Sequence, residues 1–284
     1  FTTYQDNIGE IENKGFELDF QSNFIRTKDW NVTFSGNLAH NKNKILKIAE
    51  SLKAYNDRVD QALNNPFSTN VVKSKSYRKY QEGISQSAIW AMKSLGIDPA
   101  SGDEIYLNPD GTITNHWNSS NQVIVGDEEP AIQGSFGLNV TWKRFSLYTT
   151  FMYECGGQRY NQTLADKIEG VDILRNNVDA RVLSGRWKAV GDLAPYKAIQ
   201  VKPNTSVSAT RATSRFVQDY NWVNWNSVTL EYDFNPTLIK SFGLTMLHLG
   251  VGANDLARWS SVKQERGLSY PYSKTVNFSL KASF

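Results

Sequence analysis

The last ten residues, Thr275-Val276-Asn277-Phe278-Ser279-Leu280-Lys281-Ala282-Ser283-Phe284, decide the fold of this sequence. Apolar side chains occupy every second position of this stretch, and polar side chains occupy the positions between them. This period of two is typical of a β-strand with one apolar face and one wet face. The strand belongs either to a membrane β-barrel or to the edge of a soluble β-sandwich. We favour the barrel, because an apolar residue such as Phe284 on an unshielded soluble edge would promote aggregation.

The same alternation recurs upstream in pairs of segments. Phe16, Leu18 and Phe20 alternate with acidic and amide residues, and after a polar turn the pattern resumes from Trp30. Strands are predicted near residues 14–25, 30–41, 131–142, 145–154, 222–234, 244–254 and 273–284. The expected fold class is therefore all-β, an antiparallel transmembrane β-barrel, and residues 1–284 are expected to form part of one barrel domain.

The connections between these segments alternate in length. Brief ones fall near 26–29, 143–144 and 235–243, and long ones near 42–130, 155–220 and 255–272. Outer-membrane barrels have short periplasmic turns and long extracellular loops, so the pattern predicts that the C-terminus is periplasmic. Complete bacterial barrels have an even number of strands, whereas this count is odd. We therefore expect the chain, which begins at Phe1 rather than Met, to be a piece of a longer protein with further strands upstream.

Composition excludes several classes of protein. The formal net charge is only +3, which gives no long-range field to attract nucleic acid. No stretch approaches the roughly 18–20 apolar residues that a membrane-spanning helix needs, and a mean hydropathy of −0.48 is compatible with spanning strands. The lone Cys155 has no cysteine or histidine beside it at metal-ligand spacing, and no nucleophile–base arrangement is visible. We predict neither catalytic residues nor a metal or other cofactor, so the protein is not expected to be an enzyme.

Several motifs resemble one family in order and spacing. The opening Asn7-Ile8-Gly9-Glu10-Ile11-Glu12-Asn13-Lys14-Gly15-Phe16-Glu17 is similar to the entry into a late barrel strand of SusC/RagA-type TonB-dependent transporters. Further motifs that resemble this family are Gly96–Gly102, Asn108–Thr112, Val125–Pro130, Gly185–Trp187, Thr213–Val217, Leu230–Pro236, Gly252–Leu256 and Tyr270-Pro271. Each motif is weak alone, but together they extend over nearly the whole chain.

The resemblance implies an outer-membrane barrel of about 22 strands in a Gram-negative bacterium. Its plug domain lies outside this sequence. The implied function is active import of a nutrient oligomer, an oligosaccharide or an oligopeptide. The implied partners are the TonB–ExbB–ExbD complex and a SusD/RagB-type surface lipoprotein lid, within outer-membrane lipid and lipopolysaccharide. A passive porin-like barrel and a secreted glycan-binding β-sandwich remain the alternatives.

Substrate binding is expected in the long connections, where aromatic faces stand beside polar side chains that suit sugars and peptides. The candidate residues are Trp90, Trp117, Arg159, Tyr160, Asn161, Arg186, Trp187, Asp192 and Tyr196. Alternatively, these aromatic residues form an interfacial girdle or pack against one another; Trp222 and Trp225 are expected in that girdle. The basic stretch 73–79 is interpreted as a solvated face, with contact to lipopolysaccharide phosphate as the alternative. Phe278, Leu280 and Phe284 are expected to form the barrel-assembly signal.

Overall fold

The computed structural model describes residues 9–175, 178–199, 209–263 and 274–284. Within them the chain is mostly β-strand, as predicted, and no helix is long and apolar enough to cross a membrane. Seven strands form one sheet in the order β1-β2-β8-β9-β10-β11-β12. Their bounds are β1 Gly9–Arg26, β2 Trp30–Ile48, β8 Ile132–Trp142, β9 Phe145–Tyr160, β10 Val217–Asp233, β11 Met246–Ser260 and β12 Thr275–Ser283. Residues 7–8 and 270–271 of the sequence motifs, and residue 273 of the last predicted strand, lie outside the described residues.

The chain divides into two compact units, which are described separately. The sheet unit comprises residues 15–41, 130–157 and 220–284, and the connection unit comprises residues 1–14, 42–129 and 158–219. The boundaries fall inside β1, β2, β9 and β10, so these strands are longer than the alternation predicted. Most of the extra residues of these four strands belong to the connection unit.

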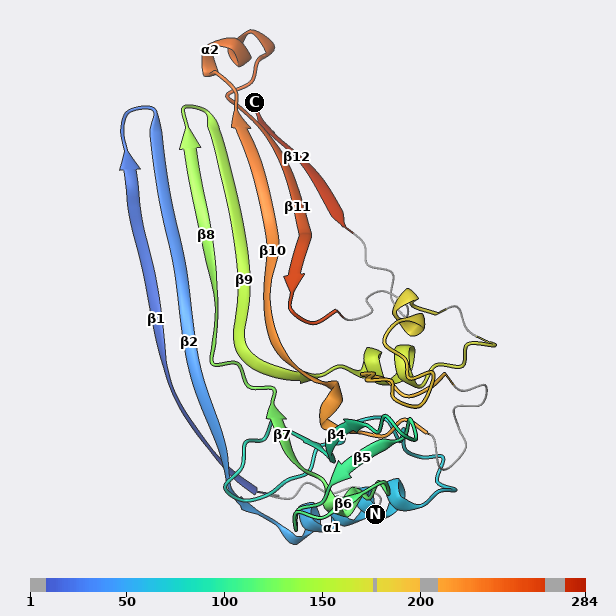
Figure 1. Ribbon diagram of the computed structural model, residues 1–284. Helices are drawn as coiled ribbons and strands as arrows, with labels where there is room; N and C mark the ends of the chain where they lie inside the picture. The colour runs from blue at the N-terminus through green and yellow to red at the C-terminus, as the bar shows by residue number, and fades with distance from the viewer. Residues whose placement is uncertain (1–8, 176–177, 200–208, 264–273) are drawn as a thin grey trace, which may run out of the picture. The chain divides into compact units, whose positions relative to one another are not determined.

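In the sheet unit, neighbouring strands follow one another in sequence except where the long insertion separates β2 from β8 (Figure 1). The turns between β1 and β2 and between β8 and β9 are short, and α2 (Pro236–Ile239) with η5 (Lys240–Phe242) connects β10 to β11. At the turn after β8, Lys143 adopts a positive φ of 53°. Figure 1 shows the C-terminus at the same end of the sheet as these three connections.

Strand pairing places the apolar side chains of the sheet unit on one face. Leu230 of β10 is opposite Val251 of β11, which is opposite Phe278 of β12. An aromatic ladder continues this face across the other strands, with ring centroids 4.9–6.5 Å apart, through Phe20, Phe34, Phe136, Phe151 and Trp225. Because side chains alternate along a strand, the residues between these positions form a polar face.

The connection unit contains most of the buried apolar side chains. Among the described residues, 18 of the 21 buried hydrophobic residues belong to it, and Tyr220, Ile239 and Val262 belong to the sheet unit. Large apolar residues of the sheet face stay exposed, including Phe278 at 80% and Leu280 at 66%. The core of the described structure is therefore in the connections and not on the sheet.

The first long connection folds into α1 and two small sheets. The elements are α1 Glu50–Asn64, β3 Ala88–Ala91, β4 Lys93–Ile97, β5 Glu104–Leu107, β6 Ile113–Thr114, η1 Ser119–Asn121 and β7 Val123–Asp127. The segments 98–102 and 108–111 form the turns that join β4 to β5 and β5 to β6, and Gly102 and Gly111 adopt φ values of 77° and 86°. A left-handed φ of this kind favours glycine.

The second long connection contains the π-helix η2 Leu164–Glu169 and two 3₁₀ turns, η3 Ala180–Leu183 and η4 Ser214–Phe216. Leu164, Ala165, Ile168 and Phe216 form its buried core. These small elements hold the polar side chains of the candidate site.

Candidate functional site

The nine predicted substrate residues all fall in the connection unit, but the structure does not bring them together in one pocket. Trp90 lies in β3, Trp117 lies between β6 and η1, and the other seven lie between residues 159 and 196. Their hydrogen bonds and burial show which of them are used inside the protein and which are open to a ligand.

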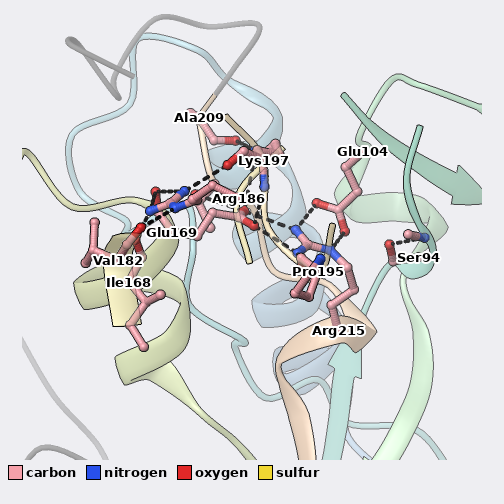
Figure 2. Close-up of polar contacts among 12 residues, drawn as sticks. Ser94, Glu104, Ile168, Glu169, Val182, Arg186, Pro195, Lys197, Ala209 and Arg215 are labelled. Atoms are coloured by element: carbon pink, nitrogen blue, oxygen red, sulfur yellow. Dashed lines mark hydrogen bonds and ion pairs between the residues drawn. The ribbon is translucent and has the colours of Figure 1, made fainter. Parts of the chain in front are cut away.

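Arg186 is buried and acts within the protein. It donates from Nη1 to the carbonyl oxygens of Glu169, at 3.2 Å, and Lys197, at 3.0 Å (Figure 2). It also donates from Nε to the carbonyl oxygen of Val182 at 3.1 Å, and from Nη2 to that of Ile168. Helix ends leave carbonyl groups without partners, and Arg186 satisfies those at the end of η2. The Arg186 guanidinium therefore connects η2, η3 and the segment at Lys197 through hydrogen bonds to their carbonyl oxygens.

Asn161 and Tyr160, which precede η2, also form hydrogen bonds within the protein. Asn161 is 1% exposed, and its Oδ1 accepts from the backbone N–H of Thr163 at 3.1 Å and of Leu164 at 3.4 Å. The Tyr160 hydroxyl donates to the carbonyl oxygen of Ser74 at 2.5 Å. Asn161 therefore holds the start of η2, whereas the Tyr160 hydroxyl is bonded to the segment at Ser74.

Trp187 and Asp192 stabilise turns. Trp187 donates from Nε1 to the carbonyl oxygen of Pro99 at 3.0 Å, and a Cβ added to Gly102 would lie 2.6 Å from its ring. The Asp192 carboxylate accepts from the backbone N–H groups of residues 188–189 at 2.9 and 3.0 Å. The indole thus packs on the turn after β4, and the carboxylate holds its own loop.

The remaining candidates differ in how open they are. Trp90 is buried in β3, and its Nε1 has no hydrogen-bond partner among the described residues. Tyr196 packs partly on the core around η2, and Arg159 is half-buried near the end of β9. Trp117 is half-buried and lines a pocket.

The basic stretch 73–79 is not simply a solvated face. Lys73 donates from Nζ to the carbonyl oxygens of Ala62, Leu63 and Asn65, at 2.5–3.0 Å, around the end of α1. The Lys79 side chain is 9% exposed, and its Nζ lies 2.5 Å from Asp60. Two of its four basic residues therefore bind groups of the connection unit itself.

A buried ionic network is the polar feature that sequence reasoning missed. Arg215 donates to both carboxylate oxygens of Glu104, each at 2.7 Å, and to both of Glu169, at 2.8 and 3.0 Å (Figure 2). The Glu104 and Glu169 side chains are 1% exposed, and that of Arg215 is 12% exposed. Lys197 also approaches Glu169, with Nζ 3.7 Å from Oε1. Arg215 lies in the motif Thr213–Val217. The resemblance of this motif to the transporter family was the only sequence feature that drew attention to a member of the network.

The network keeps Arg215 and Glu169 charged in spite of their burial. Burial acts to lower the pKa of Arg215, but its hydrogen bonds to Glu104 and the charges of both carboxylates hold that pKa above its ordinary value. Burial acts to raise the pKa of Glu169, but the adjacent Arg215 lowers it below the usual range. Buried charges persist only when they are paired and hydrogen-bonded, as these are.

Beside this network lies a pocket of about 190 Å³. Its walls are polar and aromatic, and they come from β5, from the segment after β6 and from the second long connection. The lining residues are Asp103, Glu104, Tyr106, Asn115, His116, Trp117, Lys197, Ala209 and Arg211. Within the described part of the chain, no group of three or more His, Cys, Asp or Glu side chains is placed to hold a metal ion.

The polar face of the sheet unit holds a second, shallower depression of about 360 Å³, bordered by acidic residues such as Glu17, Asp19 and Glu154. Trp222 lies on this face, because its Nε1 donates to Glu154 at 2.8 Å, whereas Trp225 stacks on the apolar ladder. Residues three apart in a strand point to opposite faces. The expectation that both tryptophans belong to one girdle is therefore wrong.

Comparison with known proteins places these features in context. No family model matches the chain. TonB-dependent receptor P3 of Formosa agariphila is 25% identical over 258 residues, which cover 88% of this chain and 24% of that protein. Receptors P39 and P26 of the same organism are 21% and 24% identical, over 90% and 93% of this chain. The resemblance to TonB-dependent receptors is confirmed.

The chain spans about a quarter of the length of these receptors. Solved structures share the fold: the RagAB peptide importer in its open-open state matches with a TM-score of 0.71 and 19% identity, over 97% of this chain and 29% of that one. Its closed-closed state matches with a TM-score of 0.66 over 91% of this chain. RagA is SusC-type, and the names of these relatives describe receptors and importers rather than enzymes.

Proposed function

We propose that this chain forms part of the wall and the outer loops of a TonB-dependent importer in the outer membrane of a Gram-negative bacterium. The observation that carries the proposal is the sheet of long antiparallel strands whose apolar face stays exposed in a chain similar to TonB-dependent receptors. A transmembrane barrel wall needs such a face toward lipid and a polar face toward its lumen. The residues 1–284 then belong to a single barrel of about 22 strands, whose plug lies elsewhere in the protein.

The cargo that we propose is an oligosaccharide or an oligopeptide. The fold shared with the RagAB peptide importer favours the peptide. The described residues of the connection unit offer polar and aromatic side chains around a pocket, which suit ligand binding. The alternatives, a passive porin and a secreted sandwich, have no comparable support.

The short connections and the C-terminus face the periplasm in this proposal, and the long connections face the medium. The three short connections share one end of the sheet with the C-terminus, and outer-membrane barrels keep their short turns on the periplasmic side (Figure 1). A surface lipoprotein of the SusD/RagB type would then close over the connection unit, and the TonB–ExbB–ExbD complex would act through the missing part. Outer-membrane lipid and lipopolysaccharide would surround the apolar face, and Phe278, Leu280 and Phe284 would serve barrel assembly.

Uptake by intact cells tests this function. The full-length protein is expressed in a strain that lacks other importers for the supplied oligomer, with TonB either present or deleted. We expect uptake and growth on the oligomer only when TonB is present. Equal uptake without TonB would favour a passive porin, and recovery of the protein as a soluble monomer without detergent would contradict a membrane barrel.

A further inference from the structure

The enclosed charges of the connection unit do not balance around the pocket beside the ionic network. Two buried carboxylates, those of Glu104 and Glu169, lie there with three cations, those of Arg215, Lys197 and Arg211, while a third carboxylate, that of Asp103, is exposed. Arg215 pairs with both carboxylates, and Lys197 shares Glu169. The third cation, Arg211, is left without a carboxylate among the described residues.

Arg211 lies against the aromatic ring of Trp117, and its positive charge acts on Lys73. Its guanidinium carbon lies 5.5 Å from the ring centroid of Trp117, a cation–π contact. Its Nη1 is enclosed and has no hydrogen-bond partner among the described residues. Burial lowers the pKa of Arg211, and burial together with the charge of Arg211 lowers the pKa of Lys73. The surroundings of Arg211 therefore leave its positive charge uncompensated.

The rest of the pocket supplies groups that suit a polar ligand. Asn115 and His116 line it beside Trp117, and the carboxylate of Glu104 is already occupied by Arg215. Asp103 also lines it, but this residue is exposed, so water screens its charge. At about 190 Å³ the pocket is smaller than the roughly 300–1,000 Å³ that enclose a whole ligand. It therefore fits one end of a longer molecule.

We propose that this pocket binds a carboxylate group at the end of a substrate chain, with Arg211 as its main charged partner and Trp117 as the wall against which the guanidinium is held. A guanidinium matches a planar carboxylate with two parallel N–H donors, which an ammonium does not. The carboxylate belongs either to the C-terminus of a peptide or to a terminal uronic acid of a glycan. The inference names the substrate chemistry of the proposed importer, and so it rests on that function.

Binding to the purified full-length protein in detergent tests the pocket without any transport. Titration calorimetry compares trialanine with trialanine amide, and a disaccharide ending in glucuronic acid with its methyl ester. We expect at least one free acid to bind about tenfold or more tighter than its neutral counterpart, and the series in which this occurs identifies the source of the carboxylate. Equal affinity within both pairs, or no binding in either, would overturn the proposal.

Two variants assign the preference to Arg211. Arg211→Gln is expected to abolish it, and Arg211→Lys to retain only part of it, because the charge stays while the paired donors are lost. Arg58→Gln, on the exposed side of α1, removes the same charge outside the pocket and is expected to keep the full preference. Thermal unfolding of each variant shows that the unit still folds, and a preference that survives in a folded Arg211→Gln protein would refute the assignment. Because this assay needs no TonB, its result is separate from the uptake test.

Discussion

The sheet unit and the connection unit treat their apolar side chains in opposite ways. The connection unit buries apolar residues such as Ile168, Val182 and Phe216 completely, whereas the sheet unit leaves Phe278 and Leu280 mostly exposed on one regular face. A water-soluble domain gains its stability by the first arrangement. The second is stable only where something other than water covers the face, and hydrocarbon is the medium that matches a continuous apolar row along spanning strands. The connection unit is therefore suited to water, and the apolar face of the sheet unit is suited to the hydrocarbon of the proposed membrane.

The largest expected effect comes from removing the centre of the ionic network in the connection unit. Arg215→Met leaves Glu104 and Glu169 buried without their main partner, which should destabilise this unit by about 3–5 kcal/mol. Hydrogen exchange of the full-length protein in detergent measures the loss of protection in residues 88–127 and 158–199. Arg58→Met, at an exposed arginine, is the control and should leave protection unchanged. Equal protection in both variants would show that the network does not hold the unit together.

A charge on the apolar face of the sheet unit should cost slightly less. Leu280→Arg places a cation on the face that is proposed to meet lipid, and it should destabilise the folded barrel by about 2–4 kcal/mol near the midplane. Ser279→Arg, one residue away on the polar face, is the matched control and should be nearly harmless. Refolding of the full-length protein into vesicles, followed by its heat-dependent gel mobility, gives the free-energy difference. Similar costs at the two positions would remove the distinction between the faces.

Acid should weaken the connection unit selectively. The pKa of Glu169 in the folded protein lies below its ordinary value of 4.5, so its contribution to stability is complete above that pH and is lost as the pH falls through the folded pKa. We expect the hydrogen-exchange protection around η2 to decline as the pH falls below about 4.5, because protonation of Glu169 removes its charge from the pairing with Arg215. In Glu169→Gln this decline should be smaller, because the carboxyl whose pKa is lowered is gone. An unchanged acid response in that variant would assign the effect to other groups.

The smallest effect concerns a single hydrogen bond within the connection unit. Trp187→Phe keeps an aromatic ring over Gly102 but removes the donor to the carbonyl oxygen of Pro99. The expected cost is about 0.5–1.5 kcal/mol, confined to the turn after β4. Ligand binding should stay unchanged, because Trp187 does not line the pocket. A loss of binding would instead restore Trp187 as a substrate residue.

The sheet was predictable from the sequence because apolar and polar side chains alternate along each of its strands. The alternation around Phe16, Trp30 and Phe278 located three strands, of which the structure extends the first two and shortens the last to Thr275–Ser283. The connection unit was less predictable, because its strands β3–β7 are too short to show a long alternating pattern. The site was the least predictable part. Residue type suggested Arg186 and Asn161, but only the tertiary structure shows that they bind backbone groups, and that Glu104, Glu169 and Arg215 meet from distant segments.

The most direct test of the account asks which medium each face of β12 meets. Single cysteines are introduced at each position from 276 to 281 of the full-length protein, with Cys155→Ser as background, and nitroxide labels are attached after reconstitution into vesicles. We predict that collision with oxygen, which concentrates in hydrocarbon, is high at 276, 278 and 280, and that collision with a water-soluble nickel chelate is high at 277, 279 and 281. A profile without this alternation, or with the apolar positions shielded from both reagents, would contradict the claim that the apolar face of the sheet meets lipid.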